Sequence, residues 1–400
     1  MAGSKPTPVL ILGGQENAIC LARGFGRRNI PVYISAPVNC YAFNSRYCSK
    51  QYPVPSNSVA DLFWEELLLS DSHPELKGCV IMVGSDVALE FVAHHKEALS
   101  ERYLLDDHIP ELHLNMLDKR KTLELGSKAG CPVPAFHDVT EIEDVEKIAK
   151  EVMYPVMIKP LHSHLFQRHF KWRKYLLANN RDELIANTRK VLNKGLQVMI
   201  TELIPGPDDL QSAYFTYMTD TGEELFEYTH QIVRRNPKNE GSGCLHISKW
   251  LPETAEMGKR FFKGIGFRGM GHIEFKRDLR DGQLKIIECN PRFSAAQAIV
   301  LKSGLDMAYI IYCHLTQREL PLDRSYKEGV RRWLVLHDIF AFMELRRLGE
   351  ITFTDWIRSI KGPPLVFPYF SASDPMPFLM RIKNDLGEGI SRRLQLPWKK

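Results

Sequence analysis

The alternation of apolar and polar residues is clearest between residues 269 and 293, GMGHIEFKRDLRDGQLKIIECNPRF, where it predicts a β-hairpin. The first arm places three polar residues on one face and two apolar residues on the other: His272, Glu274 and Lys276 against Ile273 and Phe275. In the second arm the same period groups four residues on one face: Leu284, Ile286, Glu288 and Asn290. A turn at Asp281-Gly282 then brings Glu274 opposite Glu288.

Two facing carboxylates repel each other unless a cation lies between them. Glu274, Glu288 and Asn290 offer hard oxygen ligands, which suit Mg²⁺ that is also held by substrate phosphates. The hairpin therefore predicts a metal site. A solvent-facing charged hairpin is the alternative that the alternation by itself leaves open.

The amino-terminal pattern predicts an α/β domain. An apolar strand at 9–12 runs through Gly13-Gly14 into a helix at 17–28 and a second strand at 32–35. The glycines do not fit G-x-G-x-x-G and no acid ends the second strand, which argues against a nicotinamide or flavin cofactor. A further strand at 79–83 ends at Ser85 or Asp86, either of which is suited to cap the next helix.

Further along, an apolar strand delivers Lys159 at its end in the run YPVMIKP, where a cation is well placed to pair with phosphate. The following loop, 162–174, contains no glycine and is dense in His, Arg and Lys. A strand at 197–204 stops at Pro205-Gly206, and the Gly241-Ser242-Gly243 segment reads as a mobile loop. Residues 294–316 form an apolar helical stretch, and 325–400 carry no chemistry that we can assign.

Composition adds limits rather than a function. With 400 residues, 25% of them charged, and a net charge of +5, the chain fits a globular protein and not a dedicated nucleic-acid binder. Eight cysteines without a CxxC pair, and no apolar run near ~20 residues, predict reduced thiols, a cytoplasmic location and no transmembrane segment. Composition leaves two alternatives open, namely contact with a membrane surface and assembly as a homodimer.

The run Glu288-Cys289-Asn290-Pro291-Arg292, preceded by the strand bearing Glu274, resembles the E-x-N-P-R signature of the ATP-grasp superfamily. The resemblance implies that Glu274, Glu288 and Asn290 hold Mg²⁺, with Mn²⁺ as an alternative, on the phosphates of ATP. It also implies that Arg292 steadies the transferred phosphoryl group.

Other positions extend the resemblance. Lys119, with Lys121 as its alternate, and Lys159 match the phosphate lysines of the family. The backbone groups of Glu202 and Ile204 would pair with adenine, and the ribose would be held by one of two acids: Asp208 and Asp209. The basic loop 162–174 stands where most members have a glycine-rich loop, so Lys171 or Lys174 would replace its amides, as in the carboxylate-amine ligase branch.

The resemblance implies an ATP-grasp fold of α/β and α+β class in four segments: a Rossmann-like pre-ATP-grasp domain at 1–115, a small lobe at 116–195, a large lobe at 196–320 and an extension at 321–400. The implied reaction joins a small carboxylate to an amine through an acyl phosphate and releases ADP. An ATP-grasp kinase or carboxylase and a non-catalytic nucleotide-binding module are the alternatives.

Overall fold

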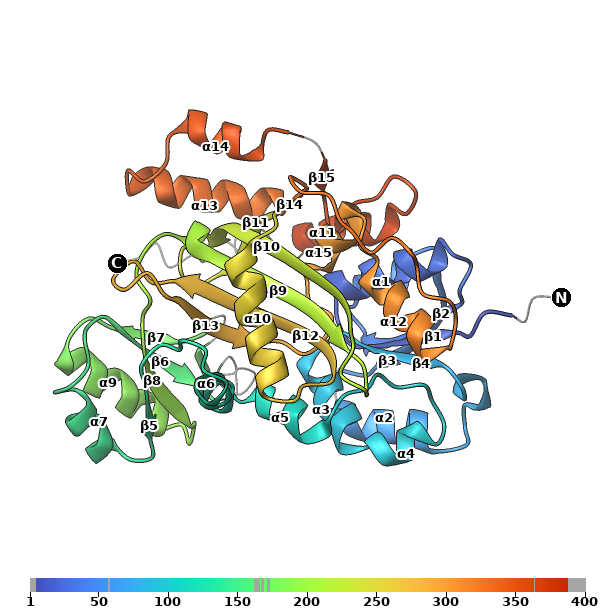
Figure 1. Cartoon of the computed structure of the whole chain (residues 1–400), viewed down its shortest axis with the longest axis horizontal. Coiled ribbons are helices and arrows are strands. Elements are labelled where there is room, and N and C mark those ends of the chain that lie inside the picture. The colour runs from blue at the N-terminus through green and yellow to red at the C-terminus, as the bar shows by residue number, and fades with distance from the viewer. Residues whose placement is uncertain are drawn as a thin grey trace. The chain divides into compact units, whose positions relative to one another are not determined.

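The computed structural model describes residues 5–56, 58–161, 166, 169–170, 173–362 and 364–387. These residues form two compact units (Figure 1). The first unit combines the chain up to residue 106 with 292–326 and with the segment from 366 onward, and the second comprises 107–291 and 327–365. The finer division into four segments stays a prediction.

The first unit contains a four-stranded parallel sheet in the order β3-β2-β1-β4. Its strands are β1 (Val9–Leu12), β2 (Val32–Pro37), β3 (Cys48–Val54) and β4 (Val80–Val83). Its first helices are α1 (Glu16–Gly26), α2 (Ala60–Leu69), α3 (Asp86–His94) and α4 (Lys96–Ser100). Every residue of β1 is buried, as parallel strands covered on both faces require. The predicted Rossmann-like opening is confirmed, and Ser85 caps α3 through its hydroxyl.

Three more helices belong to this unit: α11 (Gln297–Ser303), α12 (Met307–Leu315) and α15 (Met376–Gly387). The expected single helical stretch at 294–316 is two helices, because Gly304 adopts φ +116° and ends α11. In the described part of the chain no single helix is long and apolar enough to cross a membrane, and only the α11–α12 pair, bent by 89°, meets the criteria of length and composition.

The second unit begins with two helices and a small antiparallel sheet in the order β5-β8-β6-β7. The elements are α5 (Pro110–Leu117), α6 (Lys119–Lys128), β5 (Phe136–Val139), α7 (Ile142–Ile148), β6 (Val156–Pro160), β7 (Leu176–Ala178), α9 (Arg181–Leu192) and β8 (Val198–Glu202). Helices α7 and α9 pack on one side of this sheet around a buried apolar cluster (Figure 1).

The larger sheet of this unit has the order β13-β12-β9-β10-β11-β14-β15. Its elements are β9 (Gln211–Met218), β10 (Glu224–Asn236), β11 (Ser242–Ser248), α10 (Pro252–Gly264), β12 (Gly269–Arg277), β13 (Leu284–Cys289), β14 (Arg331–Trp333) and β15 (Leu365–Val366). Helix α10 lies along this sheet (Figure 1), with Phe261 and Phe262 packed against Ile273 and Phe275 in one apolar cluster.

The predicted hairpin is present as β12 and β13, and Glu274 lies opposite Glu288 as expected. The predicted second arm is wrong in one respect, because Ile286 and Leu284 join the apolar core and do not share the face of Glu288. The register shifts at this point, with Phe275 paired to Ile286 and Glu274 to Glu288, so Ile287 is an extra residue in β13. This β-bulge reverses the side-chain phase and turns Glu288 away from the core.

Helices α13 (Val335–Arg347) and α14 (Phe353–Ile360) complete the second unit, and α13 packs against β10 and β11 (Figure 1). The carboxylate of Asp338, fully buried, accepts hydrogen bonds from the indole nitrogens of Trp333 and Trp356 at 2.9 and 2.8 Å. Phe342 stacks on Trp356 with ring centroids 4.6 Å apart. Side chains of β14, α13 and α14 therefore converge on one buried acid.

Candidate nucleotide site

A cleft of about 710 Å³, a volume that includes its mouth open to solvent, lies within the second unit between the small sheet and the large one. It is lined by sixteen residues that several elements contribute: Lys119, Pro134, Met157, Lys159, Lys174, Tyr175, Glu202, Leu203, Ile204, Gln211, Arg235, Asn239, Glu240, Lys276, Ile287 and Glu288. Five of these side chains are cationic. A cleft that gathers this many cations favours an anionic ligand such as a polyphosphate.

Burial disfavours the protonated, charged forms of two lysines in the cleft. Burial and the neighbouring ammonium group of Lys119 lower the pKa of Lys159 to about 8. Burial likewise lowers the pKa of Lys276 to about 8, although Asp208 acts in the opposite direction. Both groups would gain from a bound anion, because it would stabilise the protonated forms.

Of the three predicted metal ligands, Glu288 lines the cleft, whereas Glu274 and Asn290 are not among its lining residues. Burial by itself would raise the pKa of Glu288, but the ammonium groups of Lys174 and Lys119 lower it to about 2, so the carboxylate is ionised at neutral pH. Asn290 donates from its side-chain amide to Oε1 of Glu288 at 3.1 Å, while Glu274 faces Glu288 across the strands. Among the described residues no group of three or more His, Cys, Asp or Glu side chains is arranged to hold a metal. A cation here would depend on two carboxylates, an amide oxygen and phosphate oxygens.

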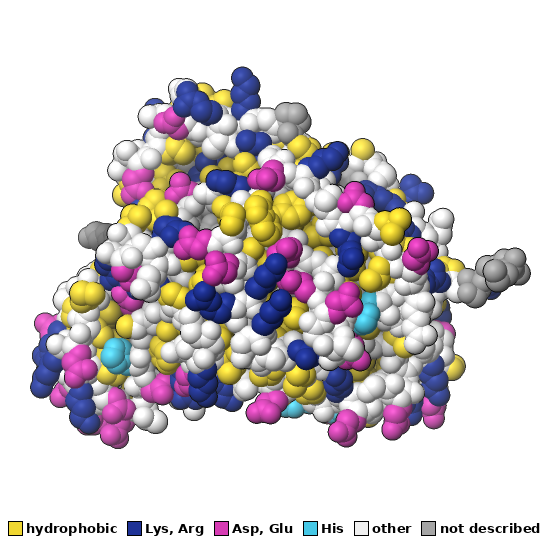
Figure 2. Space-filling model, viewed as in Figure 1, with side chains coloured by type: hydrophobic (Ala, Val, Ile, Leu, Met, Phe, Trp, Pro, Cys, Tyr) yellow, Lys and Arg dark blue, Asp and Glu magenta, His cyan; other side chains and the backbone are white. Residues whose placement is uncertain are grey.

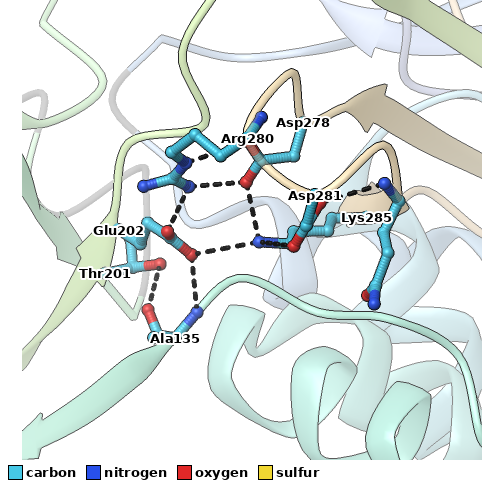
Figure 3. Close-up of polar contacts among 8 residues, drawn as sticks. Ala135, Thr201, Glu202, Asp278, Arg280, Asp281 and Lys285 are labelled. Carbon is cyan, nitrogen blue, oxygen red and sulfur yellow. Dashed lines mark hydrogen bonds and ion pairs between the residues drawn. The ribbon is translucent and has the colours of Figure 1, made fainter.

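Another part of the wall is formed by Glu202, the last residue of β8, and by Leu203 and Ile204 directly after it. Figure 3 shows the side chain of Glu202 held in a charged network with residues of the β12–β13 turn. Arg280 pairs with Glu202 and with Asp278, whose carboxylate also accepts from Lys285 at 2.7 Å. The hydrogen bond from Arg280 holds the pKa of Asp278 well below its usual range.

The backbone of this segment is also fixed. The N–H of Glu202 donates to the carbonyl oxygen of Ala135 at 2.9 Å. As Figure 3 shows, Oε2 of Glu202 also accepts from the N–H of Ala135, at 3.1 Å. The N–H of Glu202 is therefore already committed to Ala135, so the predicted pairing of Glu202 with a base would use its carbonyl oxygen.

The structure brings together six of the candidate residues in this cleft: Lys119, Lys159, Lys174, Glu202, Ile204 and Glu288. Asp208 and Asp209 are not on its wall. Asp208 is buried and accepts from the backbone N–H groups of Arg235 and Asn239 at 3.3 and 3.2 Å, whereas Asp209 is exposed. Their role as ribose ligands stays a prediction.

Arg292 belongs to the first unit, where its guanidinium pairs with Asp86 beyond the end of β4. The expected cationic loop is only partly placed. Lys174 is described and exposed, but Lys171 lies outside the described residues, as do 162–165, 167, 168 and 172.

Sequence reasoning missed Arg235 and Lys276 as cations of the cleft. Lys276 had a detectable signal, since it follows Glu274 by two residues on the same face of the predicted strand. Arg235 did not, because register shifts in β10 on both sides of Arg234 decide which of the two adjacent arginines faces the cleft. The predicted mobile loop at Gly241–Gly243 is wrong, because Ser242 and Gly243 begin β11 and pair with Asn236 and Arg235.

The face of the molecule drawn in Figure 2 carries a mixed charge. The described Lys and Arg side chains alternate there with Asp and Glu, without a continuous basic stripe. That mixture agrees with the small net charge of +5.

No protein-family model matches the chain. Among curated proteins, it is similar to the D-aspartate ligase of Enterococcus faecium, 21% identical over 244 residues, which cover 59% of the chain and 58% of that enzyme. It is also similar to the carbamoyl phosphate synthase large chain of Thermotoga neapolitana, 23% identical over 331 residues, covering 77% and 28% respectively. The chain thus spans less than two thirds of the length of these relatives.

Among solved structures, the biotin carboxylase domain of Hydrogenobacter thermophilus 2-oxoglutarate carboxylase, in complex with MgADP, ADP and bicarbonate, matches with a TM-score of 0.62 at 18% identity, covering 80% of this chain and 73% of that one. L-amino acid ligase of Bacillus licheniformis matches with a TM-score of 0.58 at 19% identity, covering 78% and 75%. The fold of the chain is that of ATP-grasp enzymes such as these two. By sequence, the chain is similar to members of the ATP-grasp superfamily.

Proposed function

We propose that the chain is an ATP-dependent carboxylate-amine ligase that activates a small carboxylate as an acyl phosphate and joins it to an amine. The observation that carries the proposal is the cationic cleft whose wall includes Glu288, with Glu274 opposite it in the hairpin. The likeness to D-aspartate ligase and L-amino acid ligase supports an amino acid as one substrate.

In this proposal each wall of the cleft has its own role. Glu202, Leu203 and Ile204 hold the base, while Lys119, Lys159 and Lys276 neutralise the phosphates. Glu274, Glu288 and Asn290 would hold Mg²⁺, which supplies charge neutralisation on the phosphates when bound. The donor set fits this ion because Glu288 stays ionised in the cationic cleft. Arg292 is proposed to steady the transferred phosphoryl group.

The chemistry follows from charge neutralisation and positioning. A carboxylate oxygen of the substrate attacks the γ-phosphorus of ATP, the bond to the bridging oxygen breaks, and ADP leaves. The amine nitrogen then attacks the acyl carbon, phosphate leaves with the electron pair of the acyl C–O bond, and the nitrogen loses a proton. ATP, carboxylate and amine give ADP, phosphate and amide.

The test is a screen of amino acids and small carboxylates in pairs, scored by ADP release and by the mass of the product. Amide product that requires both partners supports the proposal. ADP release with a carboxylate, together with hydroxamate formation when hydroxylamine replaces the amine, identifies the acyl phosphate. Absence of product from every pair, with ADP formed from bicarbonate instead, would contradict a ligase that uses an organic acid.

A carboxylase is the second candidate, because the likeness to 2-oxoglutarate carboxylase includes both its small subunit and its solved biotin carboxylase domain. Such an enzyme activates bicarbonate on the same scaffold. Bicarbonate-dependent ADP release without an organic carboxylate would favour it.

A further inference from the structure

The turn that closes the cleft, residues 237–241, lies between β10 and β11. Asn239 and Glu240 of this turn line the cleft beside Arg235. The guanidinium of Arg235 donates to the carbonyl oxygens of Gly241 and Asn239 at 2.7 and 3.2 Å. A Cβ at Gly241 would lie 1.7 Å from the carbonyl oxygen of Asn236, so only glycine fits this tight turn.

The strand residue before Arg235 faces the other way. Arg234, buried, forms a bidentate pair with Asp338 of α13, with Nε–Oδ1 2.7 Å and Nη2–Oδ2 3.0 Å. Its remaining guanidinium nitrogen donates to the hydroxyl of Ser359 in α14 at 2.7 Å. Two adjacent arginines thus connect the cleft on one side with both α13 and α14 on the other.

The turn itself is attached to α13 a second time. The backbone N–H of Lys238 donates to Oε2 of Glu344 at 3.0 Å, and the ammonium group of Lys238 pairs with Glu350 beyond the end of α13. On the cleft side, Asn239 is held by Asp208 and by the ammonium group of Lys276. The turn is therefore fixed between α13 and the wall of the cleft.

We propose that α13 and α14 form a brace behind the nucleotide cleft and that Glu344 is a positioning residue, acting through Lys238 on Asn239, Glu240 and Arg235. This inference rests on the proposed function, since it assigns the cleft to a nucleotide. The brace keeps a short turn in the conformation that receives phosphate, so the ligand does not have to order it. The helical part of the carboxy-terminal segment thereby gains a role in ligand binding.

The experiment uses the full chain and compares three variants by calorimetric titration with Mg-ADP, by urea unfolding and by hydrogen exchange of the turn. Glu344→Ala removes the acceptor, Glu344→Gln keeps one, and Glu256→Ala is the control, because Glu256 forms a helical surface pair with Arg260 on α10. We expect Glu344→Ala to weaken Mg-ADP binding on the order of 10-fold, the effect of one lost hydrogen bond to a charged group. Glu344→Gln should bind within about 2-fold of the parent and Glu256→Ala unchanged.

If Glu344 has a purely structural role, the urea midpoint of Glu344→Ala falls while its affinity for Mg-ADP is unchanged, and that result overturns the inference. Equal weakening of Mg-ADP binding in Glu344→Ala and Glu344→Gln also overturns it. In turnover assays the brace predicts a raised KM for ATP with little change in kcat. Hydrogen exchange separates the two proposals. If the parent binds no nucleotide, the proposed function fails, whereas faster exchange at 238–241 in Glu344→Ala still supports the brace and unchanged exchange refutes it.

Discussion

At the scale of single residues, the cleft contains side chains whose charged forms are disfavoured by burial. Glu288 remains ionised because Lys119 and Lys174 offset its desolvation, and burial lowers the pKa of both Lys159 and Lys276. Such an arrangement is costly in the free protein and favourable once a polyanion and a cation are bound. Individual substitutions should therefore change ligand binding more than stability.

Glu288→Gln preserves the shape of the side chain and removes its charge. We expect Mg²⁺-dependent ADP release to fall by about 100-fold or more, because a ligand charge that orients the metal is lost. Affinity for metal-free ADP should be unchanged or stronger, since one negative charge leaves the cleft. The measurements are turnover against Mg²⁺ concentration and calorimetric titration with EDTA present. A variant that retains normal turnover would show that Glu288 is not a metal ligand.

The pH dependence of nucleotide binding tests the lysines. Lys159 and Lys276 have pKa values of about 8 in the free protein, and a bound phosphate raises them, so binding takes up protons. Affinity for metal-free ADP should be highest below pH 8 and should fall as the pH rises above it. A plot of the logarithm of the binding constant against pH should approach a falling slope of about two, one for each proton taken up. In Lys159→Met this slope should decrease to about one. Binding that is independent of pH between about 7 and 10 would remove both lysines from the phosphate site.

At the scale of elements, sequence periodicity predicted the hairpin and the pairing of Glu274 with Glu288, because a two-residue period and an Asp-Gly turn together set the register. Periodicity failed to predict the second strand of the hairpin, where a β-bulge adds one residue to β13. The pattern assigned Ile286 to the face of Glu288, and no local signal in the sequence reveals that Ile287 bulges. The bulge resolves what the pattern left in conflict, namely an apolar residue and a metal-type acid on one face.

The turn of the same hairpin holds the wall that we propose to bind the base. Asp278, fully buried, holds Arg280 and Lys285, which in turn hold Glu202 (Figure 3). Asp278→Asn should lower the free energy of unfolding by about 1 to 3 kcal/mol at pH 7 and weaken ADP binding. Because the folded pKa of Asp278 is depressed, its contribution is present above the ordinary pKa of 3.8 and is lost as the pH falls below it.

The difference in stability between the parent and Asp278→Asn should therefore shrink in acid. Urea unfolding at pH 7 and at successively lower pH measures it. Asp281→Asn is the matched control, since Asp281 also pairs with Lys285 but its side chain is 39% exposed, and its effect should be small. A difference that stays constant with pH would contradict the ionic role of Asp278.

At the scale of the molecule, the resemblance to a family carried more information than periodicity did. Lys119 and Lys159 were found by motif, and both line the cleft. Arg235, Asn239 and Glu240 were not, because they reach the cleft through register shifts and a turn fixed by α13, and such long-range contacts leave no local pattern. The carboxy-terminal segment had no chemical reading for the same reason: its contacts with Arg234 and Lys238 join positions 104 and 106 residues apart in the sequence.

The cleft is assembled from segments far apart in the chain, and that property yields the last prediction. If one nucleotide occupies the cleft, Mg-ADP should slow amide hydrogen exchange together in five regions: those around Lys119, Lys159, Ile204, Arg235 and Glu288. All five should show the same midpoint concentration, because a single binding event links them. Helix α7 and strand β7 do not line the cleft and serve as internal references. Protection confined to one region, or midpoints that differ among the five, would mean that the cleft is not a single nucleotide site.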